Sequence, residues 1–206
     1  MATFMDGVLV VFCAIILAVF VSNRYRPVQY VRSSVDGREY LVRKVADRQE
    51  AADILARLNA KVLRLIDNLV TKYPDDERVA LLDDRYNPDA LSEGSNDDGY
   101  SSYTINKGKR IVLCLRSRDK KDRSNGGKLE DENTLVYVLV HELAHLATVE
   151  VGHPPEFWKN FKFLVQEAVS LGVYKDHDYS KDPVEYCGVT IDSSSVTKSG
   201  HKKAAD

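Results

Sequence analysis

The apolar and polar positions of this 206-residue chain fall into three kinds of segment: one continuous apolar run, two alternating stretches and three helical stretches. The continuous run, GVLVVFCAIILAVFVSN over residues 7–23, holds no charged side chain. As a helix it would span roughly 25 Å, close to the hydrocarbon thickness of a thin bilayer. The run therefore predicts an N-terminal membrane anchor within residues 1–26. A cleaved signal peptide and a buried core helix are the alternatives, but no basic residue precedes the run and no A-x-A site follows it.

The alternating stretches predict two β-hairpins. VQYVRSSVDGREYLVR, residues 28–43, has two β-prone runs around the turn dipeptide Asp36-Gly37. GYSSYTINKGKRIVLCLRS, residues 99–117, has its turn near residues 106–109, and residues 111–115 form the more buried strand. Residues 103–106 or 111–115 would supply a sheet edge for an extended peptide, with ordinary sheet stabilisation as the alternative.

The helical stretches lie at residues 47–73, 129–152 and 154–172. The first keeps a helical apolar period until Pro74, and the second has acidic and capping-type residues at its start. Residues 75–99 are rich in acidic side chains, so we expect a solvated helix and loop there. Residues 191–206 lack an apolar period and predict a disordered tail. The pattern predicts one α+β domain over residues 27–190, with a small antiparallel sheet or hairpins packed on helices.

Charge and cysteine content narrow the class of protein. The formal net charge of −2 argues against a protein that is basic all over and coats nucleic acid. The cysteines, Cys13, Cys114 and Cys187, are odd in number and form no CxxC pair, so we expect no disulfide framework and a reducing compartment. The positive-inside rule places the bulk of the chain on the cytosolic side, because three arginines follow the apolar run and nothing basic precedes it: Arg24, Arg26 and Arg32.

The pentapeptide HELAH, residues 141–145, indicates a metal site on the second predicted helix. The spacing i, i+4 puts His141 and His145 one turn apart on the same face, so both imidazoles can reach one tetrahedral Zn²⁺. Glu142 lies beside the first histidine, where it can take a proton from a water molecule activated by the metal. Two helical histidines that merely pack in a core are the alternative.

A third metal ligand is expected after the helix. Gly152 can end the helix, and His153 can then turn back to the metal before Pro154-Pro155 starts the next helix. Glu167 on that next helix is the alternative, because zinc accepts a carboxylate as well as an imidazole. Glu150 is closer in sequence, but it has poor reach if it lies on the same helix.

Other residues near the motif have weaker indications. Tyr179 and Tyr186 are candidates for a catalytic hydrogen-bond donor, with packing or surface roles as the alternative. Trp158 and Phe161 are expected in the core, and Cys187 is expected to be structural. The stretch RSRDKKDRSNGGK, residues 116–128, holds six basic and two acidic side chains. A solvated loop is favoured there over contacts with nucleic acid or anionic lipid, since no aromatic side chains are interleaved for base stacking.

HELAH followed by GH and EFW resembles the zincin-type metallopeptidase domains of the WLM and SprT-like groups. The wider run, SYTINKGKRIVLCLR with LVYVLVHELAHLATVEVGHPPEFWKNFKFLVQEA and DYSKDPVEYCG, resembles small predicted metallopeptidases of large nucleocytoplasmic DNA viruses and covers about half the chain. The resemblance implies a zincin-like fold, a viral origin, the ligands His141, His145 and His153, and Glu142 as general base.

We therefore expect a membrane-anchored, zinc-dependent metallopeptidase that hydrolyses peptide bonds in a protein or peptide substrate. The membrane would be that of the host cell or the virion. A non-catalytic zinc-stabilised membrane or virion protein is one alternative. The other is a nucleic-acid-dependent protease that acts on DNA-bound proteins, as the SprT-like and WLM groups do.

Overall fold

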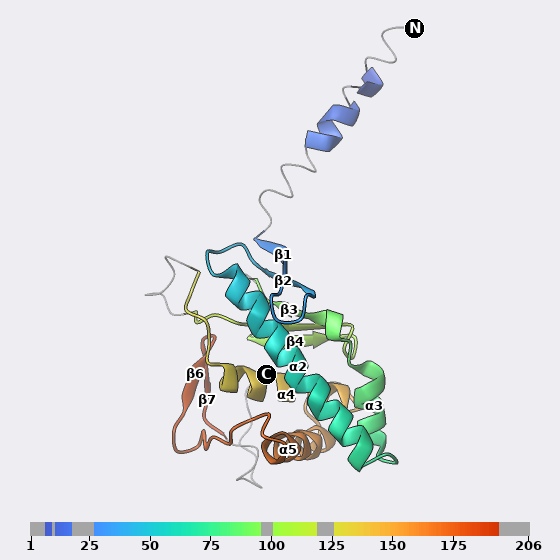
Figure 1. Ribbon diagram of the computed structural model, residues 1–206, viewed down its shortest axis with the longest axis vertical. Helices are drawn as coiled ribbons and strands as arrows, with labels where there is room; N and C mark the ends of the chain where they lie inside the picture. The colour runs from blue at the N-terminus through green and yellow to red at the C-terminus, as the bar shows by residue number, and fades with distance from the viewer. Residues whose placement is uncertain (1–6, 10, 18–26, 96–100, 119–125, 194–206) are drawn as a thin grey trace.

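The computed structural model describes residues 7–9, 11–17, 27–95, 101–118 and 126–193 (Figure 1). The fold is α+β, as predicted. Its helices are α2 (Arg48–Lys72), α3 (Glu77–Arg85), α4 (Glu132–Leu146) and α5 (Pro155–Ser170), with a short 3₁₀ helix η1 (Pro88–Ala90). Its strands are β1 (Val28–Arg32), β2 (Glu39–Arg43), β3 (Leu91–Glu93), β4 (Ser102–Ile105), β5 (Arg110–Leu113), β6 (Val184–Tyr186) and β7 (Val189–Ile191).

Both predicted hairpins are confirmed. In the first, β1 pairs with β2 in antiparallel register, and Gly37 in the turn has φ of +73°. In the second, β4 pairs with β5 around a turn in which three consecutive residues have positive φ: Asn106, Lys107 and Gly108. A side chain on Gly108 would meet the carbonyl oxygen of Arg85 at 2.3 Å, so this turn requires glycine both for its backbone angle and for its close approach to α3.

The five-stranded sheet is mixed, which corrects the prediction of an antiparallel sheet. Its strand order is β1-β2-β3-β5-β4, and β3 lies parallel to both of its neighbours. The strand β3 belongs to the acidic stretch that we predicted to be solvated, yet Leu91, Ser92 and Glu93 are each at most 4% exposed. A strand of three residues is too short to show a detectable alternation of apolar and polar side chains. The position of β3 is therefore determined by pairing with its neighbours β2 and β5.

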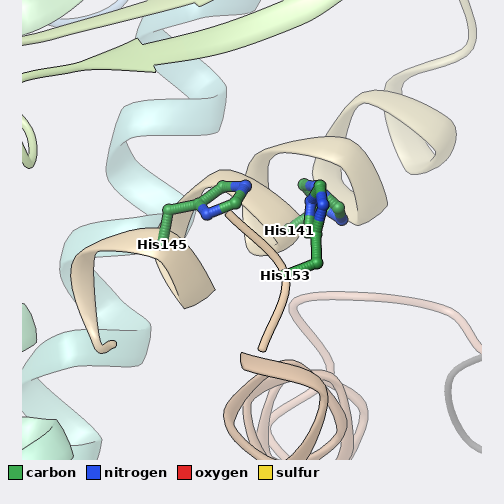
Figure 2. A group of neighbouring side chains, drawn as sticks. All are labelled: His141, His145 and His153. Atoms are coloured by element: carbon green, nitrogen blue, oxygen red, sulfur yellow. The ribbon is translucent and has the colours of Figure 1, made fainter. Parts of the chain in front are cut away.

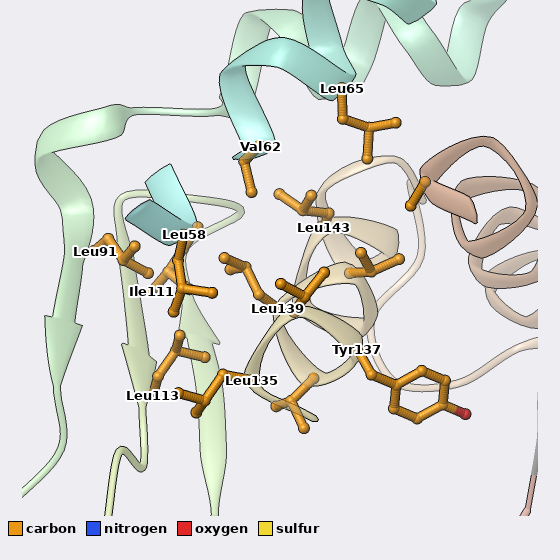
Figure 3. Close-up of a cluster of buried hydrophobic side chains, with 14 of the residues drawn as sticks. Leu58, Val62, Leu65, Leu91, Ile111, Leu113, Leu135, Tyr137, Leu139 and Leu143 are labelled. Carbon is orange, nitrogen blue, oxygen red and sulfur yellow. The ribbon is translucent and has the colours of Figure 1, made fainter. Parts of the chain in front are cut away.

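Helices α2 and α4 pack with the sheet to form the core (Figure 3). Leu58, Val62 and Leu65 of α2 approach the side of α4 that carries Leu139 and Leu143. Leu91, Ile111 and Leu113 line the sheet side of the same cluster. Helix α4 is apolar around most of its circumference because α2, α3, α5 and the sheet all contact it. Because these contacts hold α4 in place, they also fix the positions of the side chains on the face of α4 that its neighbours leave uncovered.

A disulfide between Cys114 and Cys187 corrects the prediction of unpaired cysteines. It connects the end of β5 to the turn between β6 and β7, a second small hairpin sheet that the sequence pattern did not indicate. The two cysteines are 73 positions apart, so sequence spacing carries no sign of their pairing. Disulfides persist in oxidising environments. The cysteine argument for a reducing compartment therefore no longer holds.

The N-terminal prediction is only partly covered by the described residues. Residues 7–9 and 11–17 are helical, and their large apolar side chains are more than half exposed. Within the described part of the chain, no helix combines the length and apolar character needed to cross a bilayer. Residues 1–6, 10 and 18–26 of the predicted anchor, and residues 194–206 of the predicted tail, lie outside the described residues. Ile191, predicted as the first residue of the tail, instead ends strand β7. Attachment to a membrane and the cytosolic orientation stay predictions.

Candidate metal centre

The motif HELAH lies on α4, near its C-terminal end. The helix begins after Asp131, whose carboxylate accepts a hydrogen bond from the backbone N–H of Thr134 over 3.0 Å. The 15 residues of α4 bring His141 and His145 onto one face, with ring centroids 5.1 Å apart. Figure 2 shows both imidazoles pointing to the same side of the helix, toward the segment that follows it. The predicted helical spacing is confirmed.

The third histidine reaches the first two from a loop. Helix α4 ends at Leu146, earlier than predicted, and residues 147–154 lead to α5 without regular structure. Gly152 has φ of +84°, which turns the chain immediately before His153. The Nε2 atom of His153 then lies 3.1 Å from Nε2 of His141, and the centroids of the His145 and His153 rings are 4.8 Å apart. Gly152 thus redirects the loop and does not end the helix.

Three ring nitrogens, one each from His141, His145 and His153, lie within 4.8 Å of one another. Zinc–nitrogen bonds of about 2.0–2.1 Å in a tetrahedron separate ligand nitrogens by roughly 3.3 Å. The 3.1 Å between His141 and His153 is close to that value. Three imidazoles without a thiolate also suit zinc chemically, and three protein ligands are typical of zinc sites that keep a fourth position open. The side chains present therefore fit a zinc ion.

Aromatic side chains of α5 pack against the three imidazoles. Phe157, in the first turn of α5, is fully buried, and its ring centroid lies 4.4–4.9 Å from those of all three histidines. Phe161 packs on His141 at 5.2 Å and is buried as predicted. Trp158 was expected in the core, but it is 38% exposed and lies beside His153. Phe157 and Trp158 of the EFW segment thus lie against the histidines.

Burial sets the protonation of the histidines. Burial, with the charges of His145 and His153, lowers the pKa of His141 to about 3. Burial, His153 and Lys107 lower the pKa of His145 to about 4, and burial lowers the pKa of His153 as well. All three imidazoles are therefore neutral at physiological pH, which is the form that binds a metal.

Glu142 is held next to this cluster by the edge strand of the sheet. Its side chain is 4% exposed, and Thr104 of β4 donates a hydrogen bond of 2.7 Å to its Oε2 atom. Burial raises the pKa of Glu142 to about 7, although the bond from Thr104 acts in the opposite direction. A carboxyl group that titrates near neutral pH is suited to exchange a proton during a reaction. The sequence pattern did not indicate Thr104, because the contact spans 38 residues.

Proteins of viruses resemble this chain in sequence. Uncharacterized protein R325 of Acanthamoeba polyphaga mimivirus is 38% identical over 167 residues, which are 79% of this chain and 82% of the mimivirus protein. The chain belongs to the family of mimivirus R325. Protein 136R of Invertebrate iridescent virus 6 is 40% identical over 90 residues, 44% of this chain and 48% of that protein. Protein 042R of Invertebrate iridescent virus 3 is 38% identical over 73 residues, 35% of this chain and 42% of that protein.

No family model and no solved structure matches the chain. The names of these three viral proteins state no activity, so family membership assigns no reaction to the site. A function can therefore be inferred only from the chemistry of the three histidines, Glu142 and their neighbours.

The other candidate residues, Glu167 and Tyr179, contact side chains of neighbouring elements. Glu167 accepts hydrogen bonds from Lys72 at 2.8 Å and from Tyr73 at 2.7 Å, which ties α5 to the end of α2. It is not among the clustered ligand atoms. Tyr179 is 1% exposed and packs on Tyr137 with ring centroids 4.7 Å apart. The structure therefore brings His153, and not Glu167, to the other two histidines.

Tyr186 is buried beside the edge strand β4. It is 1% exposed, donates to the carbonyl of Cys114 at 2.8 Å and shares a hydrogen bond of 2.8 Å with the hydroxyl of Ser102. Ser102 begins β4, two residues before Thr104, so Tyr186 contacts the strand that holds Glu142. Its hydroxyl is engaged in fixing that strand.

The basic loop is anchored by a buried ion pair. Arg116 was expected in a solvated loop, yet it is 2% exposed and pairs with Glu93 at 2.7 Å and with Asp47 at 2.6 Å. Burying a guanidinium requires such carboxylate partners. Residues 119–125 of the loop lie outside the described residues, so a nucleic-acid role for the loop stays a prediction.

Proposed function

We propose that this protein is a zinc-dependent metallopeptidase with a zincin-like fold. The observation that carries the proposal is the gathering of His141, His145 and His153, with ligand atoms within 4.8 Å, next to a buried carboxyl group on the same helix. Ligands and base in one HExxH helix are the arrangement that metal-assisted hydrolysis needs.

The arrangement of sheet and helix supports the zincin-like part of the proposal. The motif helix α4 lies against the sheet, and β4, the antiparallel edge strand, contacts it through Thr104 and Glu142. Among the described residues, β4 pairs with β5 on one side only. An extended peptide added along the outer side of β4 would run past Glu142, so its backbone would be held in register with the base.

The proposed chemistry divides between the metal and the chain. Zinc, when bound, supplies a Lewis acid that makes water a competent nucleophile near neutral pH. Glu142 would accept the proton that this water loses and pass it to the amine nitrogen as the carbon–nitrogen bond breaks. The hydroxyl of Thr104 would keep the carboxyl group of Glu142 in place during both transfers. Phe157 would keep the three imidazoles in their mutual orientation.

Metal content and peptidase activity test this function together. We expect one zinc per chain by mass spectrometry, loss of zinc in His153→Ala, and retention of zinc in Glu142→Gln. Hydrolysis of a protein or peptide library by the wild type should fall by about 10²- to 10⁴-fold in Glu142→Gln, the usual contribution of a general base. Glu150→Gln is the matched control, because Glu150 is an exposed glutamate of the neighbouring loop.

Three outcomes would contradict the proposal. A folded wild type without zinc would leave HELAH as a helix that carries two histidines. Zinc binding with a Glu142→Gln variant as active as wild type would remove the base from the mechanism. Zinc that stabilises the fold without any hydrolysis would instead indicate a structural metal site.

A further inference from the structure

The loop that carries His153 is ordered by side chains from other elements. The carbonyl groups at the end of α4 and in the following loop have no helical N–H partners, which leaves them to be satisfied by other donors. Arg85 at the end of α3 donates to the carbonyls of Leu146 at 2.7 Å and Thr148 at 3.1 Å. Asn160 of α5 donates to the carbonyl of Ala147 at 3.0 Å. These contacts fix the first half of the loop.

Lys107 extends this set of contacts toward His153. Its Nζ atom donates to the carbonyl oxygens of His145 at 3.3 Å, Thr148 at 2.8 Å and Glu150 at 2.8 Å. Of the three side chains that bind these carbonyls, Lys107 is the one that reaches Glu150, three residues before His153. The ammonium group of Lys107 therefore connects the backbone of His145 to the loop segment just before His153.

The position of Lys107 is set by the turn between β4 and β5. The left-handed residues Asn106, Lys107 and Gly108 bend the hairpin tightly against the ends of α3 and α4. The same hairpin holds Glu142 through Thr104. The sheet edge is thus connected to both the carboxyl group and the third imidazole of the candidate site.

The charge of Lys107 makes its role testable, because two possible effects of this residue change zinc affinity in opposite directions. A positive group close to a cation site weakens cation binding by Coulomb repulsion. Removing the charge should strengthen zinc binding if repulsion is its main effect. Removing it should weaken zinc binding if its hydrogen bonds, by ordering the loop, matter more.

We propose that Lys107 is a positioning residue for the third metal ligand, holding the loop of residues 147–152 so that His153 meets His141 and His145. This inference rests on the zinc site of the proposed function. It adds that the β4–β5 hairpin influences zinc affinity. Zinc binding by the three histidines does not by itself require this influence.

The test is the zinc dissociation constant of the full chain, measured by competition with a chromophoric chelator. Lys107→Met should bind zinc about 10- to 100-fold more weakly, the usual effect of losing a group that orients a metal ligand. Lys107→Arg keeps the charge and the donors and should recover most of the affinity. Lys109→Met is the matched control, since Lys109 is an exposed lysine of the same turn. Unchanged or tighter zinc binding in Lys107→Met overturns the proposal.

Hydrogen exchange of the metal-free chain gives a readout that does not depend on zinc. Peptides covering residues 146–153 should exchange faster in Lys107→Met than in wild type or Lys109→Met, while β1 and β2 keep their protection. If Lys107→Met fails to fold, Lys107→Gln provides a smaller change for both measurements. A wild type that binds no zinc would refute the proposed function, and the exchange data would still decide whether Lys107 orders the loop. Equal exchange in a folded variant would refute that ordering.

Discussion

Thr104 and Glu142 show how much a single hydroxyl contributes at a buried carboxyl group. The bond between them is 2.7 Å long, and Glu142 is 4% exposed, so bulk water has little access to replace the donor. A hydrogen bond to a charged group contributes roughly 1.5–3 kcal/mol. That free energy corresponds to about 10- to 100-fold in rate if the bond is needed in the transition state.

We therefore expect Thr104→Val to lower the kcat of the proposed hydrolysis by about 10- to 100-fold with zinc content unchanged. Valine has nearly the shape of threonine and suits a strand, so the backbone of β4 should be preserved. Thr104→Ser retains the hydroxyl and should keep most of the activity. Steady-state kinetics beside metal analysis would check this, and a valine variant as fast as wild type would contradict it.

The candidate ligands were predictable because their spacing is local. His141 and His145 follow from a helical period, and Gly152 with Pro154 indicates a turn that returns His153. Thr104 and Lys107 were not predictable in this way. They act on residues 38 or more positions away, and only the packing of the β4–β5 hairpin on α4 brings them there.

At the scale of elements, Asp53 ties helix α2 to the first hairpin. Its carboxylate accepts hydrogen bonds from the hydroxyls of Ser33 and Ser34, each at 2.8 Å, from the N–H of Ser34 at 2.7 Å and from Gln49 at 3.2 Å. Burial alone would raise the pKa of Asp53, but these donors outweigh it and hold the pKa below its ordinary value. The ionised form is thus preferred more strongly in the folded than in the unfolded chain.

This preference predicts a specific dependence of stability on pH. Because the folded pKa lies below the unfolded value of about 3.9, the contribution of Asp53 is fully present above pH 4 or so and is lost as pH falls through the folded pKa. Asp53→Asn should lower the free energy of unfolding by about 1–3 kcal/mol at pH 7. Denaturant titrations at several pH values should show this difference shrinking in acid. Asp67→Asn, on the exposed side of α2, is the control, and an equal loss there would contradict the assignment.

The long helices and both large hairpins could be predicted because apolar periods of ten or more residues, or a clear turn dipeptide, define them. The short elements could not. Strands β3, β6 and β7 have three residues each, too few for an alternation to stand out. Helix α4 ends at Leu146 because Arg85 and Lys107 take over its last carbonyls, although apolar residues continue to Val149 and Val151.

At the scale of the whole molecule, the disulfide joins the last hairpin to the sheet. Cys114 follows β5 and Cys187 follows β6, and next to them Tyr186 bonds both the carbonyl of Cys114 and the hydroxyl of Ser102. The C-terminal hairpin is thereby attached to the start of the edge strand β4. The mixed sheet and this attachment are long-range features, and neither could be predicted from local sequence.

Loss of this covalent bond should destabilise the whole domain. For a loop closed by residues 73 positions apart, chain entropy assigns roughly 4 kcal/mol to the cross-link. Reduction should therefore lower the melting temperature by roughly 10 °C for a chain of this size. The Cys114→Ala, Cys187→Ala double variant should melt at the temperature of the reduced wild type.

A thiol count on the same samples makes this expectation decisive. Under denaturing conditions without reductant, the native chain should show a single reactive thiol, that of Cys13, and all three after reduction. The double variant serves as the control, because reductant should leave its melting temperature unchanged. If wild type purified without reductant shows three thiols, or melts at one temperature with and without reductant, the disulfide does not support the fold. Noncovalent contacts, among them the hydrogen bonds of Tyr186 and of the Cys187 N–H, would then hold the C-terminal hairpin in place.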